Sequence, residues 1–165
     1  MKVLIISDSH GRFETLINIY ELEKPDVVLC AGDHSNDGEE LSFVYPNSQY
    51  YIVRGNCDIF DRKYSDEMII ELEGVKILLA HGHEYGVKSS YGSILKRAEI
   101  LGCNAAVFGH THIPYKEIIN KVTLFNPGAV RDGEYGILNI DKNGFEFVHK
   151  HIMLSLIHIS EPTRP

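Results

Sequence analysis

The sequence predicts an α/β protein built on a mostly parallel β-sheet. Residues 2–7 (KVLIIS) form a short apolar run rich in Val and Ile, which is typical of a buried strand. Residues 13–23 carry apolar side chains at helical spacing and end before Pro25, as a helix would. Two further apolar runs, residues 26–32 and 49–55, predict more buried strands. Strand, helix, strand and strand in this order are typical of a sheet with helices packed on it.

The rest of the chain predicts hairpins, loops and one more helix. The polar stretch 34–40 is expected to be a loop. Residues 88–101 are expected to be helical and closed by Gly102, and residues 104–110 form another buried strand. Three hairpins are also predicted, over residues 67–82 with a turn at Glu73–Gly74, residues 115–128 with a turn at Asn120–Lys121, and residues 134–151 with a turn at Asp141–Gly144.

Length and composition predict one globular domain over residues 1–153. The chain has 165 residues, of which 44% are hydrophobic and 24% charged, with no internal repeat or linker. Residues 154–165 (LSLIHISEPTRP) follow the last predicted strand abruptly and resemble the translation of a sequencing-library adaptor. They are therefore interpreted as a non-native tail, with a genuine mobile tail as the alternative.

Charge and cysteine usage restrict the class of partner and the compartment. The formal net charge is −7 and the pI is about 5.7, which argues against a nucleic-acid or membrane surface. Bound cations would still allow small phosphorylated ligands. Three scattered cysteines and the lack of a long apolar segment favour a reduced, cytoplasmic protein.

Metal-binding residue types follow the predicted buried strands. Because ligands bind outside the carboxyl ends of strands in open α/β sheets, these loops are expected to converge. Neighbouring glycines would allow close approach of backbone and ion. The clusters are Asp8-Ser9-His10, Gly32-Asp33, Gly55-Asn56, His81-Gly82-His83 and Gly109-His110-Thr111-His112.

The candidate ligands suit two metal ions. Two carboxylates, one amide and four imidazoles are oxygen and nitrogen donors of the kind that Mn, Fe or Zn prefer. They are more than one ion needs, so one carboxylate is expected to bridge two. The Asp8-x-His10 and His110-x-His112 pairs are expected to lie on extended segments, with both side chains on one face. Each motif alone is weak, since an Asp at a strand end is usually a turn or cap residue.

Taken together, the motifs DSHG, GD, GNCD, HGH and GHTH resemble the calcineurin-like metallophosphoesterase superfamily over residues 1–150. The resemblance is to the small phosphodiesterases of bacteria and archaea that lack a lid. It implies a metallophosphoesterase fold, a two-sheet β-sandwich flanked by helices. It also implies a metal-dependent phosphoesterase in which a metal-bridging hydroxide attacks a phosphodiester, in preference to a monoester.

The resemblance also implies the role of each ligand. Asp8, His10 and His112 would bind the first ion, and Asp33 would bridge the two. Three further residues, Asn56, His81 and His110, would bind the second ion. Manganese is the expected metal, with Ni, Fe, Zn and Mg as alternatives, and the expected partner is a small phosphodiester substrate.

Cys57 departs from the pattern of many relatives, which carry a histidine thought to protonate the leaving group. Positive charge from two cations would lower the pKa of the thiol and leave a thiolate without a proton to give. His34 or His83 would then be the candidate general acid, or both would be solvated loop residues. Asp58 is expected to orient Asn56 or its neighbours.

Three more residues are candidates for contact with the substrate. Asn126 and Gly128 lie in FNPGA, a segment that is near the substrate in the resembled enzymes, although a Pro-Gly turn after a strand explains it as well. Arg131 is expected either to pair with a phosphate oxygen or simply to be exposed.

Two rival functions use the same fold. The small retromer subunit of eukaryotes is an interaction scaffold, and repair nucleases share the superfamily core. Complete ligand positions favour an enzyme over a scaffold, and short length and acidic charge oppose a nuclease. The sequence leaves the natural substrate open, and also whether the chain forms a homodimer or homotetramer.

Overall fold

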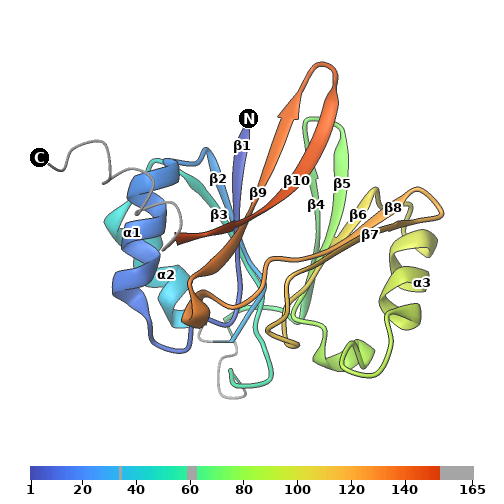
Figure 1. The fold of residues 1–165 in the computed structure, drawn as a ribbon, viewed down its shortest axis with the longest axis horizontal. Helices are drawn as coiled ribbons and strands as arrows, with labels where there is room; N and C mark the ends of the chain where they lie inside the picture. Colours follow the sequence, from blue (N-terminus) through green and yellow to red (C-terminus); the bar gives the residue numbers. More distant parts are fainter. Residues whose placement is uncertain (34, 59–62, 153–165) are drawn as a thin grey trace, which may run out of the picture.

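The computed structural model describes residues 1–33, 35–58 and 63–152, which form two five-stranded sheets flanked by helices (Figure 1). In the first sheet β1 pairs in parallel with β2 and β2 with β3, whereas β9 runs antiparallel to both β1 and β10. The strand order is β10 (Gly144–His151), β9 (Glu134–Asp141), β1 (Lys2–Ile6), β2 (Val27–Cys30) and β3 (Gln49–Ile52).

The second sheet is also mixed. Its central strands β5, β6 and β8 are parallel, and antiparallel strands β4 and β7 form its edges. The strand order is β4 (Glu67–Leu72), β5 (Val75–Ala80), β6 (Ala105–Val107), β8 (Val122–Asn126) and β7 (Tyr115–Ile119). All three predicted hairpins are present, and the predicted β-sandwich is confirmed.

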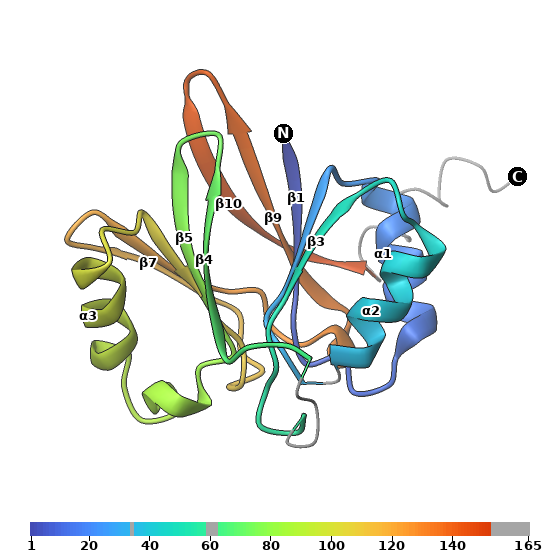
Figure 2. The same cartoon turned by 180° about the vertical axis from the view of Figure 1, so that it is seen from behind.

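The two sheets enclose one hydrophobic core and are covered by helices on their outer faces. Val3, Leu29, Ile77 and Phe125 belong to the central core between the sheets. Helices α1 (Phe13–Glu23) and α2 (Ser35–Val44) cover the first sheet, and α3 (Gly92–Ile100) covers the second (Figures 1 and 2). No helix in the described part of the chain is both long and apolar enough to span a membrane.

Two sequence-based predictions about helices were wrong. The stretch 34–40, expected to be a loop, contributes to helix α2, apart from His34, which lies outside the described residues. Of the four buried residues of α2, only Leu41 is a large apolar one, so the helix lacks an apolar period. A Cβ on Gly38 would lie only 3.3 Å from the Cys30 sulfur. Helix α3 begins at Gly92 instead of residue 88. The residues before it form turns, in which Gly86 has left-handed backbone (φ 61°) and its carbonyl accepts from the N–H groups of Ser89 and Ser90.

The sandwich brings the ends of distant strands to one edge. The loops that follow β1, β2, β3 and β5 meet at the lower edge of the two sheets in Figure 2. Backbone hydrogen bonds join neighbouring loops within each sheet. In the first sheet the Asp8 N–H donates to the Gly32 carbonyl, and in the second the Gly109 N–H, after β6, donates to the His81 carbonyl. The Val130 N–H donates to the Ser7 carbonyl and so links the segment after β8 to the end of β1.

A buried carboxylate away from this edge ties α1 to three strands. Glu23 is 5% exposed and accepts hydrogen bonds from the Tyr135 hydroxyl (2.5 Å) and the ammonium groups of Lys2 (3.2 Å) and Lys150 (3.3 Å). Burial raises the pKa of Glu23, but the hydrogen bonds from Tyr135 and Lys2 and the charge of Lys150 outweigh it and hold the pKa below its ordinary value.

We expect Glu23→Gln to lower the free energy of unfolding at pH 7 by about 2–3 kcal/mol, since hydrogen bonds to a charged group contribute roughly 1.5–3 kcal/mol. A lowered folded-state pKa means that this stabilisation is present above the ordinary pKa of 4.5 and is lost as the pH falls below it. Urea denaturation at pH 7 and pH 3.5 should therefore show a large difference between variant and wild type only at pH 7. Exposed Glu14→Gln, on the same helix, is the control; an equal loss at both pH values would contradict the charge-based explanation.

Candidate metal centre

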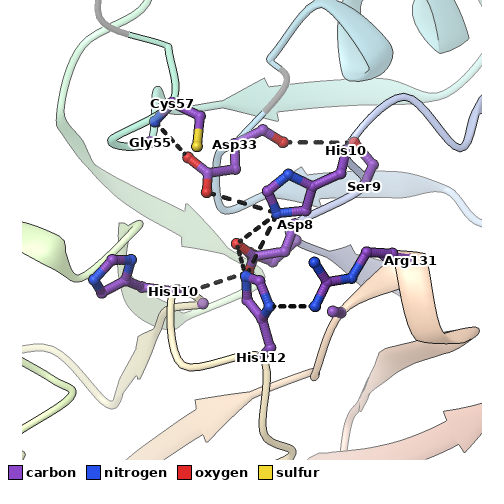
Figure 3. Close-up of polar contacts among 12 residues, drawn as sticks. Asp8, Ser9, His10, Asp33, Gly55, Cys57, His110, His112 and Arg131 are labelled. Atoms are coloured by element: carbon purple, nitrogen blue, oxygen red, sulfur yellow. Dashed lines mark hydrogen bonds and ion pairs between the residues drawn. The ribbon is translucent and has the colours of Figure 1, made fainter.

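Four of the predicted ligands form one compact group at the edge where the loops meet. Asp8, His10, Asp33 and His112 each offer a ligand atom within 4.8 Å of the others. Figure 3 shows His10 and His112 above and below the Asp8 carboxylate, with their ring nitrogens (Nε2) 3.4 Å apart. His112 Nε2 lies 3.0 Å from Asp8 Oδ1. This group matches the first predicted ion site.

One oxygen of the Asp8 carboxylate accepts hydrogen bonds from the protein, and the other accepts none. Oδ2 accepts hydrogen bonds from the Ser7 hydroxyl (2.6 Å) and the His110 N–H (3.1 Å). Oδ1 is buried without any hydrogen bond of good geometry, although the imidazoles of His10, His81 and His112 all approach it within 4 Å. Burial of a carboxylate oxygen without a partner costs free energy. A divalent cation bound by Oδ1 and the surrounding imidazole nitrogens would supply that partner.

Asp33 joins this group to the remaining three candidates. Its Oδ2 lies 3.8 Å from His10 Nε2 and 3.4 Å from His81 Nε2. With its amide nitrogen facing inward, Asn56 lies 3.0 Å from His81 Nε2 and 3.2 Å from His110 Nδ1. With its amide group rotated by half a turn, Asn56 would present its oxygen to a cation. All seven predicted ligands therefore converge, in two groups that share Asp33.

The tautomer of His81 is set by a backbone carbonyl. Its Nδ1 lies 2.7 Å from the Ala31 oxygen and can only donate to it, so Nε2 faces the two carboxylates. Burial lowers the pKa of His81, yet the hydrogen bond and charge of Asp33 and the charge of Asp8 raise it above its ordinary value overall. A bound cation would supply the positive charge that a protonated His81 otherwise gives these carboxylates.

Neighbouring charges move the pKa values of Asp33 and His110 in the direction that metal binding needs. Burial raises the pKa of Asp33, but hydrogen bonds from His81 and the Cys57 N–H (2.8 Å) hold it well below its ordinary value. Burial and the positive charges of His81 and Lys88 lower the pKa of His110 to about 4. The carboxylate is thus ionised and His110 is neutral near pH 7, as ligands must be.

The backbone at the ligands is not extended, contrary to the expectation for Asp8-x-His10 and His110-x-His112. The φ angles of these four residues are 55°, 47°, 68° and 64°, and that of Asp33 is 57°. Left-handed backbone is uncommon outside glycine, though Asn, Asp and His adopt it more readily than other residues. Alternate residues on an extended segment would share one face, whereas here sharp turns aim the side chains inward.

The glycines beside the clusters make room for carboxylates. A Cβ built on Gly109 would collide with the Ser7 hydroxyl and lie 2.6 Å from Asp8 Oδ2, and one on Gly55 would collide with Asp33 Oδ1. Gly109 and Gly55 thus accommodate the carboxylates of Asp8 and Asp33, and the expected close approach of backbone and ion stays a prediction.

Two carboxylates brace the loops that carry the ligands. Asp37, on α2, accepts hydrogen bonds from the Ser9 hydroxyl (2.7 Å) and the Gly11 N–H (3.0 Å), and so holds the loop of Asp8 and His10. Sequence reasoning missed Asp37 because it assigned no helix there. Asp58 accepts from the Gly55 N–H (2.8 Å) and the Ser35 N–H (3.1 Å), which fixes the turn that carries Asn56.

Asn126 and Gly128 form the turn that the sequence also allowed. Asn126 is fully buried; its amide nitrogen donates to the Gly109 carbonyl (3.0 Å) and the Thr111 hydroxyl (2.9 Å), and its oxygen accepts from the Gly128 N–H. Asn126 therefore braces the loop of His110 and His112. Contact between this segment and a substrate stays a prediction.

The remaining candidates lie around the rim. Arg131 is exposed and donates to His112 Nδ1 at 2.9 Å (Figure 3). His83 has a buried Nδ1 without a hydrogen-bond partner, and its ring centre is 5.5 Å from that of His81. Cys57 is exposed beside Asp33, and burial and the Asp33 carboxylate raise the pKa of its thiol. The lowering expected from two bound cations stays a prediction. His34 lies outside the described residues.

Comparison with known proteins agrees with this geometry. The family model of the calcineurin-like phosphoesterase superfamily domain matches residues 1–144. The Bacillus subtilis protein named "Probable metallophosphoesterase YsnB" is 39% identical over 132 residues, which cover 79% of this chain and 76% of that protein. "Phosphodiesterase YfcE" of Escherichia coli K12 is 27% identical over 176 residues, covering 86% and 89%.

A solved structure shows the same fold. The crystal structure of a predicted phosphoesterase from Streptococcus pneumoniae aligns with a TM-score of 0.75 at 23% identity, over 92% of this chain and 90% of that one. With most of the chain matched by the family model, and with the sandwich and the ligand motifs in place, the chain belongs to the calcineurin-like phosphoesterase superfamily.

Proposed function

We propose that the chain is a phosphodiesterase that uses two divalent metal ions to activate a bridging hydroxide for attack on phosphorus. Such a pair would lower the pKa of bound water and neutralise the charge that develops on the phosphoryl group. The observation that carries the proposal is the convergence of seven ligand side chains into two groups that share Asp33.

Each side chain has an assigned role in this proposal. Asp8, His10 and His112 hold the first ion, Asn56, His81 and His110 hold the second, and Asp33 bridges them. Mixed carboxylate, amide and imidazole donors suit Mn²⁺, the proposed metal, with Ni, Fe, Zn and Mg as alternatives. Asp37, Asp58 and Asn126 would keep the loops in place as a metal enters.

Two rim residues would act on the small diester substrate proposed here. Arg131, beside His112, would pair with a phosphoryl oxygen once it leaves the His112 ring. His83 lies next to the second ligand group and is the general-acid candidate among the described residues. We propose a cytoplasmic location because all three cysteines are unpaired, and assembly as a homodimer or homotetramer.

Metal-stripped protein should test the proposal directly. After chelation and reloading with Mn²⁺, we expect about two ions per chain and hydrolysis of bis(4-nitrophenyl) phosphate, with slower turnover of alkyl phosphomonoesters. Binding of two ions without turnover of any ester would instead support the rival function, an interaction scaffold of the same fold. Absence of metal binding would overturn both the ligand assignment and the enzymatic function.

The identity of residue 57 should set the preference for leaving groups. General acid catalysis contributes roughly 10²–10⁴-fold for poor leaving groups, and a thiol beside Asp33 and two cations is a doubtful donor. We expect Cys57→His to raise kcat/KM for alkyl esters by more than about 10-fold, and Cys57→Ala to change aryl diester turnover by less than about 3-fold. If Cys57→Ala abolished aryl diester turnover with both ions retained, the thiol would take part directly in the reaction.

A further inference from the structure

A cavity of about 210 Å³ opens beside the second ligand group. Asn56 contributes to its lining from the loop after β3, and His83 contributes from the turn after β5. Arg54, Gly55, Asp66 and Glu84 complete its lining. A substrate whose phosphorus lies between the two ligand groups would extend one ester arm into this cavity.

The walls of the cavity are charged and held in place. Arg54 forms a two-bonded ion pair with Asp66, through Nε to Oδ1 at 2.6 Å and Nη2 to Oδ2 at 3.4 Å. These bonds hold the pKa of Asp66 below its ordinary value, so the carboxylate stays ionised at neutral pH. The second carboxylate, Glu84, is about half exposed and lies 4.0 Å from His83 Nε2. Among the described residues of this wall, two carboxylates and one guanidinium provide several hydrogen-bond acceptors.

That chemistry selects among the possible ester arms. A second phosphate on the arm would lie close to the carboxylates of Asp66 and Glu84, which oppose its charge. Hydroxyl groups, in contrast, can donate to the carboxylates of Asp66 and Glu84 while the metal ions hold the phosphoryl group.

We propose that this cavity is a specificity subsite for a polyol arm, so that the substrates are small phosphodiesters of glycerol-like or sugar-like alcohols. The inference rests on the proposed phosphodiesterase function and adds to it the class of substrate. Glu84 is the residue best placed to test it, because it is exposed and contributes to no strand or core, so that its replacement spares the fold.

Two pairs of probes separate the polyol from its aliphatic counterpart. Glyceryl methyl phosphate and propyl methyl phosphate are compared as substrates of the Mn²⁺-loaded protein. The methyl esters of 3,4-dihydroxybutylphosphonate and butylphosphonate, whose arms carry a P–C bond, are compared by calorimetry. We expect the hydroxylated member of each pair to be preferred about 10-fold or more, as hydrogen bonds to charged groups allow.

Glu84→Gln should reduce both preferences to about 3-fold or less, and exposed Glu99→Gln on α3 should leave them unchanged. If the wild type hydrolysed bis(4-nitrophenyl) phosphate but showed no preference for the polyol member of either probe pair, the subsite alone would be overturned. An unchanged preference in Glu84→Gln would also overturn it. If the Mn²⁺-loaded wild type hydrolysed none of these diesters, the proposed function would fail, and the subsite with it.

Discussion

Asp33→Asn should abolish nearly all phosphodiesterase activity and release at least one of two metal ions. The change keeps the shape of the side chain but removes the charge that both ligand groups share through Oδ2. It also removes the partner that raises the pKa of His81. Because loss of residues that merely orient metal ligands costs roughly 10- to 100-fold in affinity or activity, loss of the shared ligand should cost more than about 100-fold.

Metal content by mass spectrometry and turnover of an aryl diester measure the two effects separately. Asp141→Asn, at the last residue of β9, removes one negative charge far from the ligands and is the matched control. Two bound ions and near-normal turnover in Asp33→Asn would refute the bridging role.

Gly109→Ala should inactivate the protein without altering any ligand. The new methyl group would collide with the Ser7 hydroxyl and lie 2.6 Å from Asp8 Oδ2, so Asp8 or the whole loop of His110 must move. A misplacement of about 1 Å can cost roughly 100-fold in rate, and overpacking typically costs about 1–3 kcal/mol of stability. We therefore expect a loss of metal affinity, a fall in turnover of more than about 100-fold and a lower melting temperature.

Gly92→Ala is the control for this substitution, because a Cβ there meets nothing within 4 Å and Ala favours the helix that begins at Gly92. It should leave activity unchanged and stability equal or slightly higher. Should Gly109→Ala bind two ions and turn over at the wild-type rate, Asp8 would not be held by the contacts described here.

The sequence was sufficient to predict the strands and the convergence of the candidate ligands for identifiable reasons. Short apolar runs determine buried strands almost by themselves, and the turns at Glu73–Gly74 and Asn120–Lys121 adopt the left-handed backbone that such hairpins need. Strand topology then placed His81 and His110 at the same edge as Asp8, although about a hundred residues separate the last two along the chain.

What the sequence did not reveal depends on contacts between distant segments. Helix α2 packs through Leu41, Gly38 and small polar residues, so it has no apolar period from which a helix could be predicted. Asp37 was missed for the same reason. The roles of Asn126 and Asp58 as braces follow from which N–H groups the fold brings to them. The cavity next to Asn56 depends on Asp66 and Glu84, which belong to no recognisable motif.

The left-handed backbone at five ligand residues also has a consequence for the evolution of this chain. Each such residue costs roughly 1 kcal/mol relative to glycine, so Asp8, His10, Asp33, His110 and His112 together oppose folding by an amount comparable with the net stability of many domains. Replacement of any one by glycine would relieve strain and delete a ligand at the same time. Drift without selection for metal binding would therefore remove these side chains, and a sequence that keeps all five is one in which selection for the site has outweighed the gain in stability.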